Sequence, residues 1–223
     1  MVTVNHHDRQ TFKKSYLKRI QCVLTFEKTE WTDELKKKAN DLLKGNGFDL
    51  KATGDLSMVQ GIRNATVVIL TDKGMMINTD KIDYGGFDDY KVFLSEIMIP
   101  LLTMSGVKTI TTCIFQKSNS YKINKGKVKM ELTKEQVLST LFTPLLTEAN
   151  VPVGVMENEY FYTSQYKYED KEETIIIELI ISSMKLYEQS TEGFVERLEI
   201  VNQRMYDFWY ESVSEKVRKS MEG

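Results

Sequence analysis

Apolar and polar residues alternate along the first clear element of the chain. The segment Tyr16–Glu27 places apolar residues at every second position, as in a strand with one buried face. Those residues are Ile20, Cys22, Leu24 and Phe26. A helix is expected next, because Thr32 or Asp33 can cap it and the apolar residues from Leu35 to Leu43 share one helical face. Gly45 and Gly47 predict the end of that helix.

The next hundred residues predict further strands and a second helix. Ala65–Thr71 is dense in β-branched residues, and a turn at Gly74 joins it to the following strand as a hairpin. Asp88–Ser105 has the wide apolar face of a buried helix, which Pro100 should kink or split because proline lacks a backbone donor. Val107–Gln116 then predicts another strand.

The second half of the chain repeats the mixture of helices and strands. A helix is predicted near Thr133–Ala149, where Thr133 and the glutamine three positions later match a capping box. Two strands, Val155–Tyr168 and Glu173–Ser183, are joined by a short charged turn and should pair antiparallel. Thr191–Met221 contains no proline and predicts one long helix.

These elements predict an α+β fold, with two α+β halves, a mixed or antiparallel sheet and a long C-terminal helix. Residues 1–14 are expected to be a flexible N-terminal tail. The first half would span 15–117 and the second 118–223, with a boundary in the polar segment Ser118–Leu132. One continuous domain is the alternative.

Composition narrows the class of protein. Of 223 residues, 41% are hydrophobic and 28% are charged, which is typical of a globular chain. No apolar run approaches the ~20 residues of a membrane span, and residues 1–16 lack the apolar stretch of a signal peptide. A cytoplasmic protein without a membrane partner is therefore expected. The net charge of −2 argues against nucleic-acid binding. The lysines from Lys117 to Lys129 could form a local basic patch, but they are interpreted as a solvated loop or hairpin.

The cysteines and histidines predict neither a metal site nor a cofactor. Cys22 and Cys113 each lie in an apolar run without another ligand at metal-binding spacing, so both are expected to be buried and reduced. If their strands are neighbours, a disulfide between the two cysteines is the alternative. His6 and His7 lie in the predicted tail, and adjacent residues of an extended chain point in opposite directions.

The sequence contains no enzyme signature of the phosphate-binding loop, nucleophile elbow or zinc-motif type. The weak catalytic candidate is Glu178, a carboxylate inside an apolar strand, where burial would raise its pKa. The alternative is a position on the solvent face, or a salt bridge across the sheet.

Aromatic residues provide the candidate ligand or interface surface. Four tyrosines share one face of a predicted strand: Tyr160, Tyr162, Tyr166 and Tyr168. They could grip a ligand, whereas the alternatives are packing beneath a helix and a dimer interface. In the terminal helix, Phe208 and Trp209 lie in succession with Tyr210, so more than one face should be buried, and a dimer contact is expected there.

The order of elements also resembles a sporadically distributed, functionally uncharacterised prokaryotic protein family of about this size. The similar segments are Tyr16–Phe26, Tyr90–Leu102, Thr109–Phe115, Glu173–Ser183, Phe194–Met221 and the tripeptide Tyr210-Glu211-Ser212. That family has no established activity and occurs in variable gene neighbourhoods that resemble mobile elements. The resemblance therefore implies a role in bacterial defence.

Three functional hypotheses follow. The first is a non-enzymatic interaction or regulatory protein that forms a homodimer and binds an unidentified protein partner. The second is a sensor that binds a small molecule or nucleotide in a pocket lined by the tyrosines. The least favoured is a carboxylate-based enzyme that uses Glu178.

Overall fold

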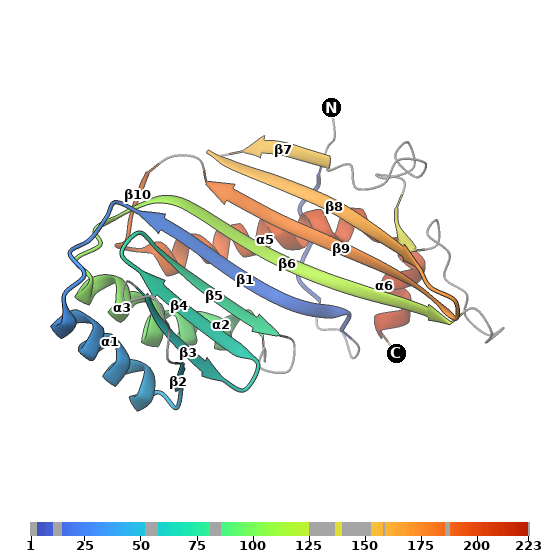
Figure 1. The fold of residues 1–223 in the computed structure, drawn as a ribbon. Helices are drawn as coiled ribbons and strands as arrows, with labels where there is room; N and C mark the ends of the chain where they lie inside the picture. The colour runs from blue at the N-terminus through green and yellow to red at the C-terminus, as the bar shows by residue number, and fades with distance from the viewer. Residues whose placement is uncertain are drawn as a thin grey trace. The chain divides into compact units, whose positions relative to one another are not determined.

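The fold is given by a computed structural model (Figure 1). The structure describes residues 4–10, 15–51, 58–80, 86–124, 137–139, 153–157, 159–185 and 188–222. Of these residues, 45% lie in strands and 34% in helices. The strands form one ten-stranded, mostly antiparallel sheet, so the predicted α+β class was wrong and the fold is dominated by its sheet. Periodicity identifies strands one at a time and does not reveal which strands pair.

The elements follow one another in a simple order. The strands are β1 (Leu17–Phe26), β2 (Asp49–Lys51), β3 (Met58–Arg63), β4 (Thr66–Thr71), β5 (Gly74–Asp80), β6 (Thr109–Asn124), β7 (Val153–Glu157), β8 (Tyr160–Asp170), β9 (Thr174–Lys185) and β10 (Gln189–Ser190). The helices are α1 (Asp33–Gly45), α2 (Phe87–Phe93), the π-helical turn η2 (Leu94–Met98), α3 (Ile99–Met104), α5 (Phe194–Ser212) and α6 (Glu215–Glu222). The strand order is β2-β3-β4-β5-β1-β6-β9-β8-β7, and β10 pairs with β6.

The chain divides into two compact units that are each assembled from separated segments. Unit 1 contains Met1–Lys18, Gln116–Ser183 and Asn202–Gly223, and unit 2 contains Arg19–Phe115 and Met184–Val201. These units are interleaved along the chain, whereas the predicted halves were consecutive. The predicted polar boundary begins inside β6, because that strand continues to Asn124.

In unit 2, the local predictions for α1 and the hairpin are confirmed. Thr32 caps α1, and its side chain accepts a hydrogen bond from the Leu35 amide at 3.1 Å. The helix ends at Gly45 as expected. Strands β4 and β5 form the predicted hairpin, with Leu70 opposite Met75.

The predicted second helix is interrupted ahead of Pro100. Helix α2 passes into η2 and then into α3, and the Ile99 amide bonds to the Leu94 carbonyl five residues earlier. Proline has no amide hydrogen and its ring crowds the preceding turn, so the local change from α-helical to π-helical bonding is the expected response.

In unit 1, the predicted single strands and helices are each broken. Val155–Tyr168 is two strands, because β7 and β8 form a hairpin in which Glu157 lies opposite Tyr160. The predicted helix Thr191–Met221 stops at Ser212 and resumes at Glu215. Between them, Val213 forms an isolated β-bridge with Leu138. The predicted helix near Thr133–Ala149 lies outside the described residues, apart from 137–139.

Among the described residues, no helix is long and apolar enough to cross a membrane.

Candidate functional site

Glu178 occupies a half-buried position on β9 in unit 1. Its carboxylate is 3.5 Å from the ammonium group of Lys18, and its side chain is 24% exposed. The adjacent residues Ile177 and Leu179 are fully buried on the other face of the strand. This is a salt bridge near solvent, and it gives Glu178 no feature of an activated catalytic acid.

The tyrosines singled out in the sequence divide into three buried residues and one exposed residue. Tyr160, Tyr162 and Tyr166 are 8%, 3% and 0% exposed, whereas Tyr168 is 40% exposed. The Tyr162 ring stacks on Phe208 with 5.6 Å between ring centroids. Burial raises the pKa of Tyr162 well above its ordinary value. These three side chains therefore pack in the core of unit 1.

Phe208 and Trp209 also lie in that core rather than on a surface. Phe208 is completely buried, and Trp209 is 8% exposed. The indole N–H of Trp209 donates a hydrogen bond to the Tyr121 hydroxyl at 3.2 Å. The succession of aromatic residues in α5 therefore reflects burial on more than one face of that helix.

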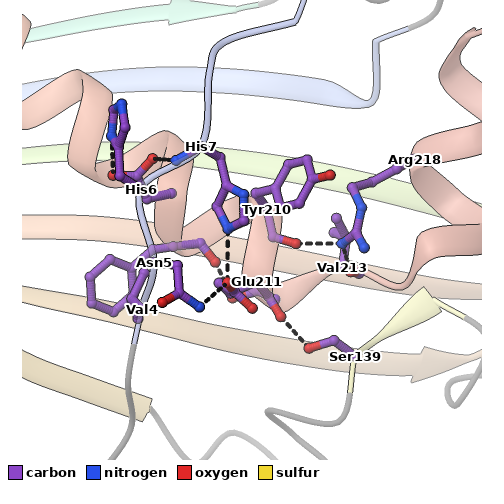
Figure 2. A network of polar contacts seen from close by, with 12 residues as sticks. Val4, Asn5, His6, His7, Ser139, Tyr210, Glu211, Val213 and Arg218 are labelled. Carbon is purple, nitrogen blue, oxygen red and sulfur yellow. Dashed lines mark hydrogen bonds and ion pairs between the residues drawn. The ribbon is translucent and has the colours of Figure 1, made fainter.

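A polar cluster on α5 was not anticipated from the sequence (Figure 2). Residues 4–10, predicted to be a flexible tail, lie against Asn202–Ser212, and Val4 is buried. Gln203, Asp207 and Glu211 follow one another at intervals of four, so they share one face of the helix. That spacing is the sequence signal that could have revealed the cluster. Asp207 is the most deeply buried charged residue of the cluster, because it is only 2% exposed.

Side chains of α5 bind the backbone of the N-terminal segment. The His7 amide donates to Asp207 Oδ1 at 3.0 Å, and the His7 carbonyl accepts from Gln203 Nε2 at 2.9 Å. Arg204 Nη1 donates to the Val4 carbonyl at 3.0 Å. The Gln10 amide donates to the Tyr206 hydroxyl at 3.3 Å. Four backbone groups of the segment are therefore bonded by four different side chains.

The imidazole of His7 has its own place in the cluster. Its ring stacks on Tyr210 with 4.0 Å between centroids, and Nε2 lies 2.8 Å from Glu211 Oε1. Asn5 Nδ2 donates to the same carboxylate oxygen at 3.2 Å. Burial pushes the pKa of Glu211 upward, but the hydrogen bonds from His7 and Asn5 outweigh burial and hold that pKa below its usual value.

His6 and Arg204 both lie close to the Asp207 carboxylate, at the middle of this face of α5. His6 Nδ1 lies 3.5 Å from Asp207 Oδ2. Arg204 bonds to Glu157 of β7 at 2.6 Å and lies 3.5 Å from Asp207. The carboxylate of Asp207 thus has a backbone amide, a glutamine amide and a guanidinium around it, which explains how a charged group is accommodated at 2% exposure.

Lys117 lies in strand β6. Its ammonium group donates a hydrogen bond to the side-chain oxygen of Asn202, which is buried. Lys117 as a whole is half-buried, and burial lowers its pKa to about 7, with the nearby cation of Arg9 acting in the same direction. A lysine in this setting is partly neutral at physiological pH.

A second candidate surface is the face of the unit 2 sheet that is turned away from α1. Helix α1 packs against β2 and β3, and a Cβ placed on Gly61 would lie 3.2 Å from Leu43 of α1. Gly61 pairs with Val68, which pairs with Ile77. Directly paired residues point to the same face, so these three mark the covered face. In Figure 1, α2 and α3 lie behind these strands, and none of the helices described within unit 2 lies in front of them.

The residues between these positions make up the open face. Two rows of directly paired residues cross β3, β4, β5 and β1 in the registers given by the sheet. The first row is Ile62, Val67, Asn78 and Gln21, and the second is Gln60, Ile69, Met76 and Val23. All eight are half-buried and none is charged. We call these eight residues the open face.

The two cysteines lie on neighbouring strands of unit 2. Cys22 and Cys113 belong to the neighbouring strands β1 and β6, and both are buried free thiols. Within the described parts of the chain, no group of three or more histidine, cysteine, aspartate or glutamate side chains could hold a metal ion.

Neither protein-family models nor curated proteins give a match to this sequence. The family resemblance therefore stays a prediction.

Proposed function

We propose that this chain is a non-enzymatic interaction protein that forms a homodimer through the open face of unit 2. The observation that carries the proposal is the absence of charge from all eight residues of that face, five of which are aliphatic or methionine. Charged residues are depleted in the cores of protein interfaces, and contiguous apolar surface marks interaction sites.

The border of the open face supports the same proposal. Arg19 and Asp80, which are directly paired at the edge of the two rows, form an ion pair at 3.1 Å. Their charges neutralise one another. A surface without net positive charge does not attract the phosphates of a nucleic acid, so an uncharged protein surface is the better fit.

A second copy of the chain satisfies the chemistry of this face. In a two-fold dimer the same patch meets itself, so apolar rows lie on apolar rows. Asn78 Oδ1 is buried and accepts no hydrogen bond from any residue within the described ranges. Gln21, its directly paired neighbour, carries an amide whose N–H donates only weakly, to the Met76 sulfur at 3.3 Å.

Light scattering after size-exclusion chromatography tests the dimer. We expect the wild-type chain to elute with about twice the 25.9 kDa mass of one chain. Ile69→Lys, which places a charge at the centre of the open face, should give the mass of a single chain. Ile200→Lys is the matched control, because Ile200 is 69% exposed on α5 and lies outside the open face. A wild-type monomer at 100 µM would refute the proposal.

The cellular part of the proposal rests on sequence alone. We extend the proposal to a cytoplasmic interaction or regulatory protein with a role in bacterial defence, which the family resemblance supports. Comparison of gene neighbourhoods tests this part: a recurrent association with defence genes supports it, and a scatter among housekeeping genes contradicts it.

A further inference from the structure

The contacts between α5 and residues 4–10 have the form of a peptide bound to a receptor. Most of the hydrogen bonds join side chains of the helix to backbone groups of the N-terminal segment: Arg204 to the Val4 carbonyl, Asp207 and Gln203 to the two backbone groups of His7, and Tyr206 to the Gln10 amide. Recognition through the backbone gives affinity for an extended peptide, while one side-chain pocket gives specificity.

The side-chain pocket that gives specificity is the one that holds the imidazole of His7. Figure 2 shows its imidazole lying over the Tyr210 ring and directed at Glu211. A carboxylate beside an aromatic ring favours a flat side chain that can donate a hydrogen bond, which an imidazole does. The ring of Tyr210 is itself held in place, because the Arg218 guanidinium lies 4.2 Å from its centroid.

The site is preorganised by contacts that do not involve the N-terminal segment. Arg204 is held by Glu157 at 2.6 Å, and Gln203 Nε2 also donates to Asp207 at 3.0 Å. Ser139 donates to the backbone carbonyl of Glu211. Side chains that are already fixed lose less entropy when a peptide binds, so this face of α5 is ready for a ligand without the segment that now occupies it.

We infer that this face of α5 is a peptide-binding site, and that residues 4–10 of a second copy of the chain can occupy it in place of the chain's own segment. The occupant is identified by the contacts themselves, since an identical segment reproduces every backbone bond and places the same imidazole between Tyr210 and Glu211. Each chain's own segment is held near the site at a high effective concentration, so the exchange is a minor population at 100 µM and the Ile69→Lys chain keeps the mass of a single chain.

Binding of a synthetic peptide to the full chain tests the inference. The probe is a fluorescently labelled peptide with the sequence of residues 4–10. The chain with His7→Ala keeps the whole receptor site but loses the imidazole contacts of its own segment. We expect this variant to bind the peptide at least tenfold more tightly than wild type, because its own segment competes less well.

Two controls separate specific recognition of the peptide from non-specific binding. A peptide with alanine in place of its second histidine, which corresponds to His7, should bind the His7→Ala chain at least tenfold more weakly than the unaltered peptide. This control alters only the peptide, so it carries no folding risk. Adding Glu211→Gln to the His7→Ala chain should also weaken binding. Equal binding of the two peptides, or no binding to the His7→Ala chain at millimolar peptide, would overturn the inference.

The same titration in the Ile69→Lys background separates this inference from the proposed dimer. Peptide binding should be unchanged there, because Ile69 lies in unit 2 and the α5 site is built from residues of unit 1. If peptide binding disappears together with the dimer, the site on α5 is not an independent peptide receptor.

Discussion

The ammonium group of Lys117 donates its hydrogen bond to the side chain of Asn202, a buried residue of α5. This places a cation-forming group where water is largely excluded, and burial lowers the pKa of Lys117 to about 7. The unfolded chain, with an ordinary lysine pKa of 10.5, therefore holds a proton that the folded chain has lost between pH 7 and pH 10.5.

The free energy of unfolding should therefore rise with pH across that window. One proton per molecule corresponds to an increase of up to about 1.4 kcal/mol per pH unit, and below pH 7 both states are protonated and the cost of burying the charge applies in full. We expect Lys117→Met to lose this rise, as measured by urea unfolding at intervals from pH 6 to pH 10. Lys73→Met, which removes an exposed lysine, is the control. Parallel curves for Lys117→Met and wild type would contradict the prediction.

The two cysteines should be nearly inert in the folded chain. The thiols of Cys22 and Cys113 contact one another, and the hydrogen bond between them, followed by burial, raises the pKa of Cys113 well above its ordinary value. Because the thiolate is the reactive form, alkylation by iodoacetamide at pH 8 should be slower by on the order of a hundredfold than in denaturant. A Lys73→Cys variant should react at once at its new thiol. Fast labelling of the native wild-type chain would show that these strands open readily.

Alanine substitutions at two glycines should change the free energy of unfolding in opposite directions. A Cβ on Gly74 would lie 2.8 Å from the Leu24 carbonyl oxygen of the neighbouring strand, so Gly74→Ala forces the backbone apart. We expect a loss of about 1–3 kcal/mol in the free energy of unfolding. Gly45 ends α1, and a Cβ at that position would have no other atom within 4 Å, so Gly45→Ala should add about 0.5–1 kcal/mol. Chemical denaturation of both variants checks the pair, and a neutral Gly74→Ala would be the contrary result.

The aromatic residues of β8 and α5 should behave as core rather than as a binding surface. Phe208 is fully buried against Tyr162, so Phe208→Ala should cost about 3–5 kcal/mol of stability. Tyr168→Ala removes an exposed ring of the same predicted strand face and should change stability by no more than about 0.5 kcal/mol. Thermal unfolding distinguishes the two variants. Similar, small effects for both would favour a ligand-binding surface instead.

The sequence by itself determined the elements whose signals are local. Strand β1 follows from alternation, the start of α1 from the Thr32 cap, and the β4–β5 hairpin from the turn at Gly74. Each of these depends on residues a few positions apart, whose side chains bond to the adjacent backbone or share one face. Pro100 likewise acts on the turn that precedes it, so the break in the helix was predictable although its π-helical form was not.

Only the tertiary structure decided what joins distant segments. Strand β3 was not predicted, because Gln60 and Gly61 interrupt its apolar pattern, and its place is set by pairing with β2 and β4. The break after Ser212 depends on residues 137–139, and the binding of residues 4–10 depends on side chains about two hundred positions away. Such contacts form only when the chain has already been brought together, because closing a long loop costs entropy that no local pattern records.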